Sequence, residues 1–430
     1  MAVDTPAKIA ILGAGPIGLE AALYARFLGY DVAIYEQGAD IAAAVQAWGH
    51  VKMFTPFGMN RSPLGLAALA AQDEAYRPPG DDELLTGRQW RDRYLVPLSK
   101  TDLLADHLRL GQRVLRIGKE QLHKGELVGD AERGDWPFRL LILDRQGVER
   151  IDHADVVIDA SGVFFGPTAW FGEGGIPALG EMERMASGAI EHALPDLSGE
   201  DRQRYAGQHT LVIGAGYSAA TNIVALAQLA REVPGTRVTW VTRGPPFCEQ
   251  DSSVRGPIRI IPGDRLPQRD ALAREANALS KDPACDVTHL PETVVHAVSK
   301  CSDDGPFHVR LIGRHCDTLS CDQIIANVGF RPDRAVYEEL LIHECYASHG
   351  PMKLAAAMLS AASADCLDQK ACGPLTLLNP EPNFYILGAK SYGRKSNFLL
   401  ATGLAQIREI FTVIGDRPTL DLYSTPPRRA

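Results

Sequence analysis

The sequence has few cysteines, no long apolar run and no excess of basic residues. Its eight cysteines in 430 residues are irregularly spaced, and no C-x-x-C pair occurs. Such sparse cysteine usage excludes a disulfide scaffold and favours reduced thiols, as in a cytoplasmic protein. Acidic residues outnumber basic ones by 53 to 44, which gives a net charge of −9. This balance argues against nucleic acid as a partner.

Uninterrupted apolar segments long enough for a transmembrane helix are also missing. The stretch 9–28 is largely apolar, but it is interrupted by Gly13, Gly15, Pro16, Gly18 and Glu20. We interpret this stretch as a buried strand, a turn and a helix rather than as a signal peptide. No run of about 18 apolar residues occurs elsewhere, so we expect no membrane span.

Several patterns that mark catalytic or metal sites do not occur either. The G-x-S-x-G, H-E-x-x-H and Walker A motifs are all absent, so the chemistry that those motifs carry is not indicated. The spacing of His308, His315, Cys316 and Cys321 matches no zinc pattern. We therefore expect no bound metal.

What the sequence does contain is two glycine-rich fingerprints in the same local order. In the first, an apolar strand at 8–12 leads into glycines, a helical stretch and a second strand at 31–36. The same order recurs at 209–242. Each is a βαβ unit with a right-handed parallel crossover. The predicted fold class is therefore α/β, with two Rossmann-like dinucleotide-binding domains.

The first fingerprint has the spacing of an FAD or NAD site. Gly13 permits the tight turn, Gly15 lets the backbone approach a pyrophosphate, and Gly18 lets the helix pack close to the strand. Glu36 ends the second strand. A carboxylate there accepts hydrogen bonds from a ribose diol and repels a 2′-phosphate, which disfavours NADP.

The second fingerprint differs at the position that discriminates between dinucleotides. Gly214 and Gly216 repeat the pattern, and Ala219 occupies the third glycine position. Arg243 follows the second strand of this unit. A cation at that corner suits a 2′-phosphate, so we expect NADPH here.

The order of an FAD fingerprint, an NADPH fingerprint and a C-terminal flavin segment resembles the two-dinucleotide-binding-domain flavoproteins, in particular the flavin-containing monooxygenases of class B. The segments that carry the resemblance, besides the fingerprints, are Trp48–Asn60, Asp159–Val163, Ala326–Phe330 and Asn383–Gly393. The resemblance implies a discontinuous FAD domain at 1–165 and 326–430. An NADPH domain at 166–325 would be inserted into it, with the nicotinamide reaching the flavin.

The resemblance also implies the cofactor-binding residues. For FAD these are Gly13, Gly15, Pro16, Gly18, Glu36, Gln37, Trp48, Val114, Ser161, Gly162, Gly388, Lys390, Ser391, Phe398 and Gly403. For NADPH they are Gly214, Gly216, Tyr217, Ser218, Ala219 and Arg243. Ala389 stands where the family carries an acid near the ribityl chain, and Lys390 or Ser391 is expected to substitute for it. The helix that contains 404–410 is expected to point its N-terminus at the flavin pyrimidine.

Disulfide reductases of this architecture need a redox-active dithiol beside the flavin. Residues 37–65 contain no cysteine, and Cys316 and Cys321 lie in a hairpin-like stretch before 323–329. We interpret this pair as ordinary thiols. Reduced flavin is then expected to pass its electrons to oxygen or directly to a substrate.

Asn60 is the predicted catalytic residue, because an asparagine occupies the comparable flavin-facing stretch in flavin-containing monooxygenases. An amide donates and accepts hydrogen bonds without titrating. A purely structural role, as a turn residue before Ser62, remains open. The signature of Baeyer–Villiger enzymes is incomplete, because Ala169 and Trp170 stand where its histidine belongs. The segment 165–178 is rich in glycine and proline and suits a hinge between domains.

The predicted function is that of an FAD-dependent, NADPH-using monooxygenase. It would transfer one oxygen atom from O2 to a small soft nucleophile such as an amine or a thioether. Two alternatives stay open: an NAD(P)H-dependent flavin reductase or dehydrogenase without a stable peroxyflavin, and a non-catalytic flavin redox sensor. The expected partners are the small-molecule substrate and O2, with homodimer formation left open.

Overall fold

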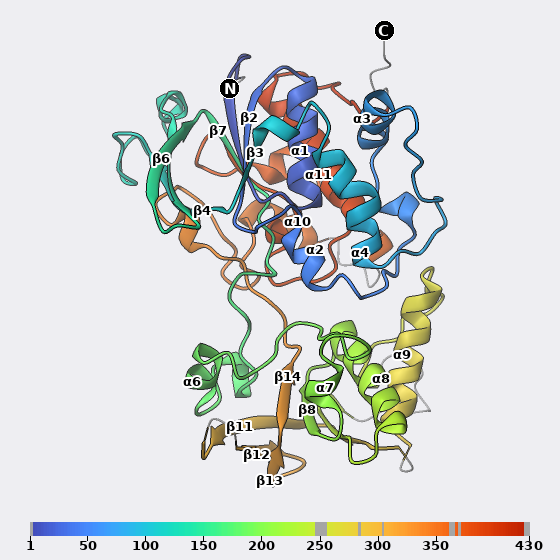
Figure 1. Cartoon of the computed structure of the whole chain (residues 1–430). Helices are drawn as coiled ribbons and strands as arrows, with labels where there is room; N and C mark the ends of the chain where they lie inside the picture. Colours follow the sequence, from blue (N-terminus) through green and yellow to red (C-terminus); the bar gives the residue numbers. More distant parts are fainter. Residues whose placement is uncertain are drawn as a thin grey trace. The chain divides into compact units, whose positions relative to one another are not determined.

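The computed structural model of the chain describes residues 3–245, 256–282, 285–302, 305–360, 366–368 and 371–424. The chain divides into two compact units (Figure 1). The first unit comprises Met1–Pro167 and Phe330–Ala430, and the second comprises Thr168–Gly329. No helix in the described part of the chain has both the length and the apolar composition needed to cross a membrane.

The first unit is built around a parallel sheet with the strand order β15-β7-β1-β2-β3. A separate antiparallel sheet has the order β4-β5-β6. The strands are β1 Lys8–Leu12, β2 Asp31–Glu36, β3 Leu108–Leu110, β4 Gln112–Lys119, β5 Phe138–Asp144, β6 Glu149–Ala154, β7 Val156–Asp159 and β15 Phe384–Ile386. The helices are α1 Pro16–Phe27, α2 Ala43–Ala47, α3 Pro63–Gln72, α4 Gly87–Trp90, α5 Val96–Ser99, α10 Met352–Ser360 and α11 Leu400–Ile414.

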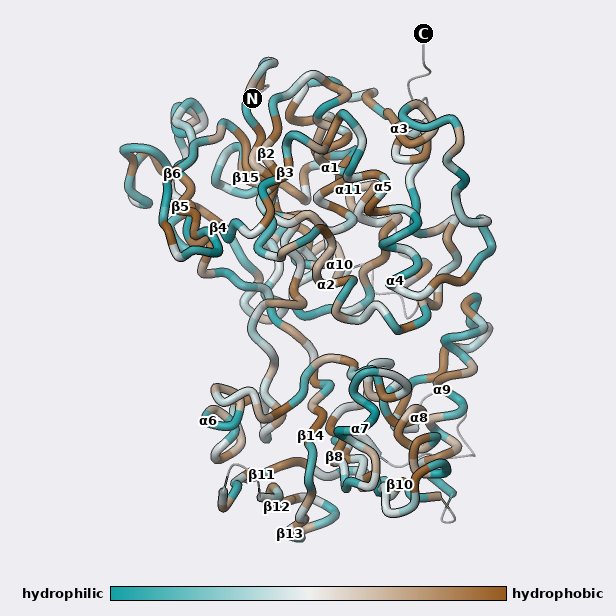
Figure 2. The backbone as a smooth tube through the Cα atoms, viewed as in Figure 1, coloured by the Kyte–Doolittle hydropathy of each residue, from teal (hydrophilic) through white to brown (hydrophobic). Residues whose placement is uncertain are grey.

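Both faces of the central parallel strands are covered, which explains their continuous apolar sequences. Every residue of β1 after Lys8 is buried, as is every residue of β7, as expected for a parallel sheet with layers on both sides. On one face α1 packs against α11, and the rings of Tyr24 and Phe411 stack with centroids 5.0 Å apart. On the other face β5 presents the buried Phe138 to the sheet. Figure 2 shows apolar residues along α1, α11 and the sheet strands.

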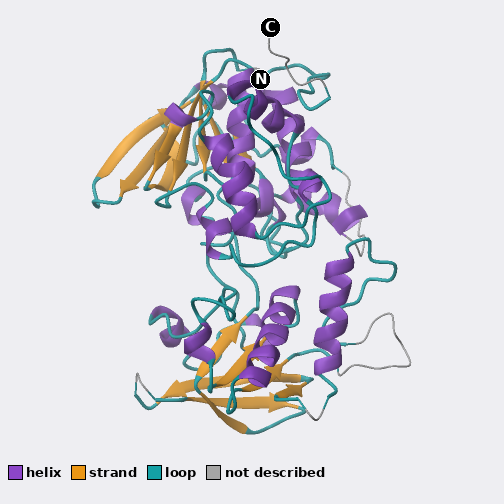
Figure 3. Cartoon of the chain, turned by 45° about the vertical axis from the view of Figure 1, so that its right-hand side comes forward, coloured by secondary structure: helices purple, strands orange, loops and turns teal. Residues whose placement is uncertain are grey.

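The second unit repeats this plan. Its parallel sheet has the order β10-β9-β8-β14, and an antiparallel sheet has the order β11-β12-β13. The strands are β8 His209–Ile213, β9 Arg237–Val241, β10 Val287–Leu290, β11 Thr293–Lys300, β12 Phe307–Gly313, β13 Thr318–Cys321 and β14 Gln323–Ala326. The helices are α6 Glu181–Ala186, α7 Arg202–Tyr205, α8 Tyr217–Glu232 and α9 Pro267–Leu279. Separate helical and strand layers are visible within each unit (Figure 3).

The correspondence between the units extends to the order of elements along the chain. In each unit a βαβ start is followed by the antiparallel sheet, and the next strand then returns to pair with the first strand. Thus β7 pairs in parallel with β1, and β14 pairs in parallel with β8. The predicted βαβ units are present as β1-α1-β2 and β8-α8-β9, each with parallel pairing. Each unit therefore contains one Rossmann-like sheet.

Candidate functional site

A cavity of about 440 Å³ opens at the carboxyl ends of β1, β2 and β7, where ligands bind in open α/β sheets. We call it the glycine-loop cavity, and all its lining residues belong to the first unit. Its walls bring together segments far apart in the sequence. Predicted site residues among its lining are Gly13, Gly15, Pro16, Glu36, Gln37, Trp48, Asn60, Val114, Ser161, Gly162, Gly388 and Phe398.

The three glycines of the first fingerprint occupy three different environments. A Cβ on Gly13, which has φ +95°, would come within 2.9 Å of the backbone at Ala160 and Ser161. A Cβ on Gly18 would lie 1.8 Å from the carbonyl oxygen of Gly13. Gly15 differs, because a Cβ there would have no other protein atom within 4 Å. Gly13 and Gly18 are therefore required by packing, and Gly15 leaves open space beside the backbone.

The start of α1 offers unpaired donors beside that open space. The helix begins with Pro16 after Gly15, and no side chain caps its first N–H groups. Free N–H groups and the helix dipole favour an anion at this position. The absence of a side chain at Gly15 and the uncapped helix start together match a pyrophosphate group.

Glu36 presents its carboxylate at the end of β2 and is only 6% exposed. Its Oε2 accepts a hydrogen bond from the Ala14 N–H at 2.9 Å, and its Oε1 accepts one from the Gly38 N–H at 2.7 Å. Each carboxylate oxygen can accept a second bond. The remaining acceptor positions of Glu36 suit the two hydroxyl groups of a ribose. Together with the N–H groups at the start of α1, they give the cavity donors and acceptors that fit an adenine dinucleotide such as FAD.

The loop that contains Asn60 forms another part of the cavity wall. Three acceptors share the two hydrogens of Asn60 Nδ2: the Thr55 carbonyl at 3.0 Å, Thr55 Oγ1 at 2.8 Å and the Pro56 carbonyl at 2.9 Å. Its Oδ1 is 3.2 Å from Thr55 Oγ1, and Trp90 Nε1 donates to its backbone carbonyl at 2.8 Å. The amide nitrogen is thus committed to the loop, and Oδ1 retains acceptor capacity.

A buried ion pair joins the end of β7 to the 3-10 turn that follows β15, next to the cavity. Lys390 Nζ lies 2.6 Å from Asp159 Oδ2, and the two side chains are 1% and 0% exposed. Ser391 Oγ donates to the Gly388 carbonyl at 2.8 Å and accepts from Gln406 Nε2 at 2.9 Å. Lys390 and Ser391, both predicted to contact the cofactor, are therefore engaged within the protein and are not among the lining residues.

The last helix of the first unit begins at the cavity. Phe398, Leu399 and Leu400 line it, and α11 starts at Leu400. Gly403 lies one turn further on, where a Cβ would come within 2.2 Å of Ile17. Gly403 therefore allows α11 to pack closely on α1. Only the start of α11 lines the cavity.

The second fingerprint adopts the same backbone arrangement in the second unit. A Cβ on Gly214, which has φ +137°, would lie 2.4 Å from the Asn327 carbonyl, whereas a Cβ on Gly216 would meet no atom within 4 Å. Ala219 is fully buried in α8, whose first residues are Tyr217 and Ser218 and whose start has no side-chain cap. The glycine turn is further held by Trp240, whose Nε1 donates to the Gly214 carbonyl at 2.8 Å.

Arg243 lies two residues beyond the end of β9. By the strand register Thr242 corresponds to Glu36 of the first unit, and Arg243 corresponds to Gln37. The Arg243 side chain is exposed. The preceding residue, Thr242, is buried, and its hydroxyl is 2.9 Å from His289 Nε2. Burial lowers the pKa of His289 to about 4. The imidazole of His289 is therefore neutral at neutral pH, and the exposed Arg243 directly follows its partner Thr242 in the chain.

The two thiols that could form a redox pair have unlike environments. Cys316 is exposed and donates to the Gly313 carbonyl at 3.1 Å. Cys321 is buried at the end of β13, and burial raises the pKa of its thiol to about 12. A thiol of such high pKa is a poor nucleophile at neutral pH.

Sequence reasoning missed several residues of the glycine-loop cavity. The segment Ala42–Val45 lines it at the start of α2, and the Ala42 N–H donates to the Ala14 carbonyl at 3.0 Å. The run of small side chains after Glu36 was a usable signal, because small residues let a ligand approach the backbone. Other lining residues lie on separate segments and had no such signal: Trp90, Gln112, Arg113, Asp333 and Val336.

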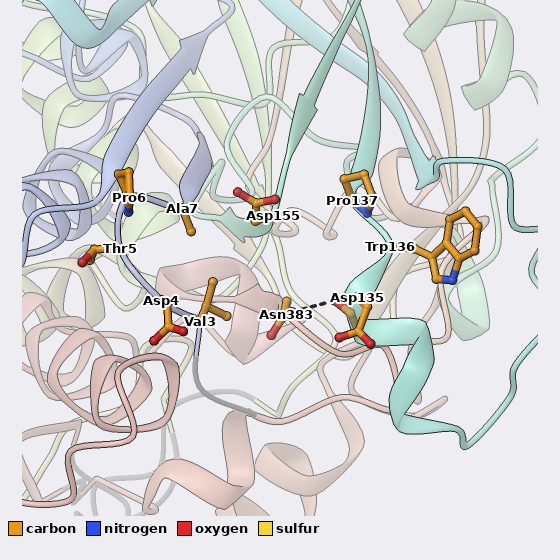
Figure 4. A pocket seen from close by; sticks show the side chains of 11 residues that line it. Val3, Asp4, Thr5, Pro6, Ala7, Asp135, Trp136, Pro137, Asp155 and Asn383 are labelled. Atoms are coloured by element: carbon orange, nitrogen blue, oxygen red, sulfur yellow. Dashed lines mark hydrogen bonds between the residues drawn. The ribbon is translucent and has the colours of Figure 1, made fainter.

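A second cavity of about 420 Å³ lies at the other, amino-terminal end of β1 (Figure 4). It is lined by Val3–Ala7, Gly134–Pro137, Asp155 and Asn383. Asn383 Nδ2 donates to the Gly134 carbonyl at 3.2 Å, the bond drawn in Figure 4. None of its lining residues is shared with the glycine-loop cavity.

Comparison with known proteins gives structural but no sequence matches: no family model matches the chain, and no curated protein does. The bacillithiol disulfide reductase of Bacillus cereus aligns with a TM-score of 0.62 at 17% identity, covering 96% of this chain and 99% of that chain. The FAD-bound cadaverine monooxygenase of desferrioxamine biosynthesis from Erwinia amylovora aligns with a TM-score of 0.60 at 13% identity, covering 99% and 100%.

The ornithine N-hydroxylase of Kutzneria sp. 744, in a structure with reduced FAD, NADP+ and L-ornithine, aligns with a TM-score of 0.59 at 14% identity, covering 96% of this chain and 100% of that chain. At these identities the likeness is one of fold. The predicted resemblance and fold class are confirmed at that level: the chain has the α/β fold of flavoprotein oxidoreductases, a group that includes both reductases and N-hydroxylating monooxygenases.

Proposed function

We propose that the chain is an FAD-dependent oxidoreductase that takes electrons from NADPH, and that it acts as a monooxygenase on a small soft nucleophile such as an amine or a thioether. In this proposal the first unit is the FAD domain and the second unit is the NADPH domain. The observation that carries the proposal is the glycine-loop cavity, with open space at Gly15 and the anchored carboxylate of Glu36.

The assignment of NADPH to the second unit rests on Arg243. The glycine turns of the two units are alike, so the residue at the end of the second strand discriminates between ligands. A guanidinium can form charge-assisted hydrogen bonds with a 2′-phosphate, and a carboxylate at the same position would repel it. The solved structure with both reduced FAD and NADP+ shows that this fold can hold the pair.

Bound FAD would supply the redox chemistry, accepting a hydride from NADPH and reacting in its reduced form with O2. The protein would contribute orientation and a dry environment. Met53 and Trp48 bring apolar surface to the cavity wall. Asn60 fixes the loop through Nδ2, and its Oδ1 would accept a hydrogen bond from an N–H of the reduced ring.

Transfer to an internal dithiol is disfavoured by the state of the cysteines. The sequence contains no C-x-x-C, and Cys321 has a thiol pKa near 12. No cysteine is among the residues that line the glycine-loop cavity. Electrons on the flavin would therefore pass to oxygen or to an external acceptor.

A second candidate function is a reductase whose acceptor is an external small molecule. The structural likeness to the bacillithiol disulfide reductase, at a TM-score of 0.62, favours it. Such an enzyme uses the same two cofactor sites, and its reduced flavin needs no protection from water.

Rapid mixing separates the two candidates. The purified protein is loaded with FAD, reduced with NADPH without oxygen, and mixed with oxygenated buffer while flavin absorbance is followed. A monooxygenase should form a spectral species distinct from oxidised and reduced flavin that persists with NADP+ bound and releases little H2O2. Asn60→Ala should shorten its lifetime and raise H2O2 release, whereas Asn379→Ala, which removes an amide outside the cavity, should behave as wild type.

Two other outcomes would overturn the proposal at different levels. Immediate reoxidation with one H2O2 released per NADPH would exclude the monooxygenase and leave the reductase. Failure of the wild-type protein to bind FAD, measured by titration of flavin fluorescence, would exclude both.

A further inference from the structure

The ion pair between Asp159 and Lys390 is a closed polar network at the wall of the glycine-loop cavity. The two residues are separated by 231 positions in the sequence. Asp159 ends β7, and Lys390 lies in the 3-10 turn that follows the neighbouring strand β15. Lys390 also faces the ring of Tyr337, with Nζ 5.2 Å from the ring centroid. Buried charges of this kind are costly unless every donor and acceptor is satisfied. The network has one member that reaches the cavity, Ser161.

The hydrogen bonds of Ser161 fix the direction in which its hydroxyl can bind a ligand. Ser161 Oγ donates to Asp159 Oδ1 at 2.6 Å, and it accepts from Lys390 Nζ at 3.1 Å. The Ser161 N–H also points to Asp159 Oδ1, at 3.1 Å. A hydroxyl has one hydrogen and two lone pairs. Its hydrogen and one lone pair are therefore in use, and one lone pair is left.

We infer that Ser161 accepts a hydrogen bond from a hydroxyl group of the ribityl chain of FAD, and that Asp159 and Lys390 hold Ser161 in this acceptor state. The inference rests on the proposed function and deepens it. An acceptor-only oxygen repels a phosphate oxygen, which is also an acceptor, and it binds a group that donates. Within FAD, the sugar hydroxyls and the ribityl chain supply such donors.

The strand order decides whether the donor is a hydroxyl group of the adenosine ribose or one of the ribityl chain. Glu36, the partner proposed for the adenosine ribose, ends β2 on one side of β1, and Ser161 follows β7 on the other side. The uncapped start of α1 follows β1 between them. With the pyrophosphate there, the flavin half of the ligand extends toward β7 and β15. The next residue in that direction, Ala389 after β15, lines the cavity but has no polar side chain.

The test compares a ligand that has the ribityl chain with one that lacks it. Dissociation constants for FAD and for ADP are measured with the full-length apoprotein by calorimetry. Ser161→Ala should weaken FAD by roughly 2- to 13-fold, the cost of one neutral hydrogen bond, and leave the ADP affinity unchanged. Ser161→Thr, which keeps the hydroxyl, should restore FAD binding. Ser99→Ala is the matched control, because Ser99 Oγ donates to the Val96 carbonyl away from the cavity.

The positioning role of the ion pair is tested in a double-mutant cycle. Asp159→Asn combined with Lys390→Met removes both buried charges together, so that neither is left unpaired. This variant should also weaken FAD and spare ADP. Adding Ser161→Ala to it should cause no further loss, because the pair acts through Ser161.

The possible results distinguish this inference from the proposed function. If the wild-type protein binds FAD and Ser161→Ala binds it equally well, the inference fails and the proposed function stands. An equal loss for FAD and ADP, or additive losses in the cycle, would also overturn it. If the wild-type protein binds ADP but not FAD, the proposed function fails and the inference fails with it.

Discussion

Substitution of Gly15 by alanine should separate folding from cofactor binding. Gly15 has an extended backbone conformation, φ −78° and ψ −177°, that alanine adopts without strain. An alanine Cβ would have no other protein atom within 4 Å. The variant protein should therefore fold, and its apo form should be more stable by about 0.4–1 kcal/mol, because alanine has fewer conformations to lose on folding.

The same methyl group would occupy the space proposed for the pyrophosphate. Forcing an extra methyl group into a close contact costs about 1–3 kcal/mol, which corresponds to a roughly 5- to 150-fold loss of FAD affinity. Gly18→Ala provides the opposite case. Its Cβ would lie 1.8 Å from the Gly13 carbonyl, so this variant should be destabilised in the absence of any ligand.

The assay is urea unfolding of the apoproteins, combined with fluorescence titration of FAD and kinetic titration of NADPH. Gly216→Ala is the matched control, because Gly216 has equally open surroundings in the second unit. It should weaken NADPH and leave FAD unaffected. Wild-type FAD affinity in a folded Gly15→Ala protein would refute the placement of the pyrophosphate.

Three further predictions concern the NADPH site, a buried carboxyl group and a pair of cysteines. Arg243→Ala should raise the KM for NADPH by about 10- to 150-fold, the worth of a charge-assisted hydrogen bond, and spare NADH; unchanged NADPH kinetics would contradict the assignment. Burial raises the pKa of Glu20 from 4.5 to about 7, so the wild type should lose up to about 3 kcal/mol of stability as the pH rises from 4.5 to 7. In urea unfolding, the stability of Glu20→Gln should depend much less on pH. A parallel decline of stability in both proteins would contradict this prediction. Replacing Cys316 and Cys321 together by serine should leave the rate of flavin reduction and reoxidation unchanged in stopped-flow measurements, and a slower reoxidation would reinstate a dithiol relay.

The scaffold could be predicted from the sequence because its signals are local. Each parallel strand is a short apolar run, since layers cover both faces of the sheet, and each glycine turn directly follows such a run. The spacing predicted a tight turn at Gly13, open backbone for a pyrophosphate at Gly15 and close helix packing at Gly18. The turn at Gly13, the open space beside Gly15 and the close contact at Gly18 agree with this prediction. Glu36 could be placed for the same reason, because the end of β2 has a fixed position relative to the turn.

The cavity wall could not be predicted as well, because it depends on contacts between distant segments. Lys390 was expected to face the cofactor, but Asp159, far away in the sequence, holds its charge in a buried pair. Asn60 illustrates a different difficulty. Its place at the cavity could be predicted. The hydrogen bonds of its amide nitrogen to Thr55 and Pro56 could not, because they depend on how the loop from Thr55 folds back.

In the proposed assignment, the two units use one backbone plan for two different dinucleotides. Their glycine turns match, with the first glycine against a crossover turn and the second beside open space, so the backbone alone recognises only a pyrophosphate. In this assignment, discrimination falls to the residues at or just beyond the end of the second strand. There Glu36 is buried and anchored by two backbone N–H groups, which suits an uncharged diol. Arg243 is exposed, and an exposed guanidinium can pair with a phosphate that keeps part of its hydration, at a smaller desolvation cost than a buried pair would carry.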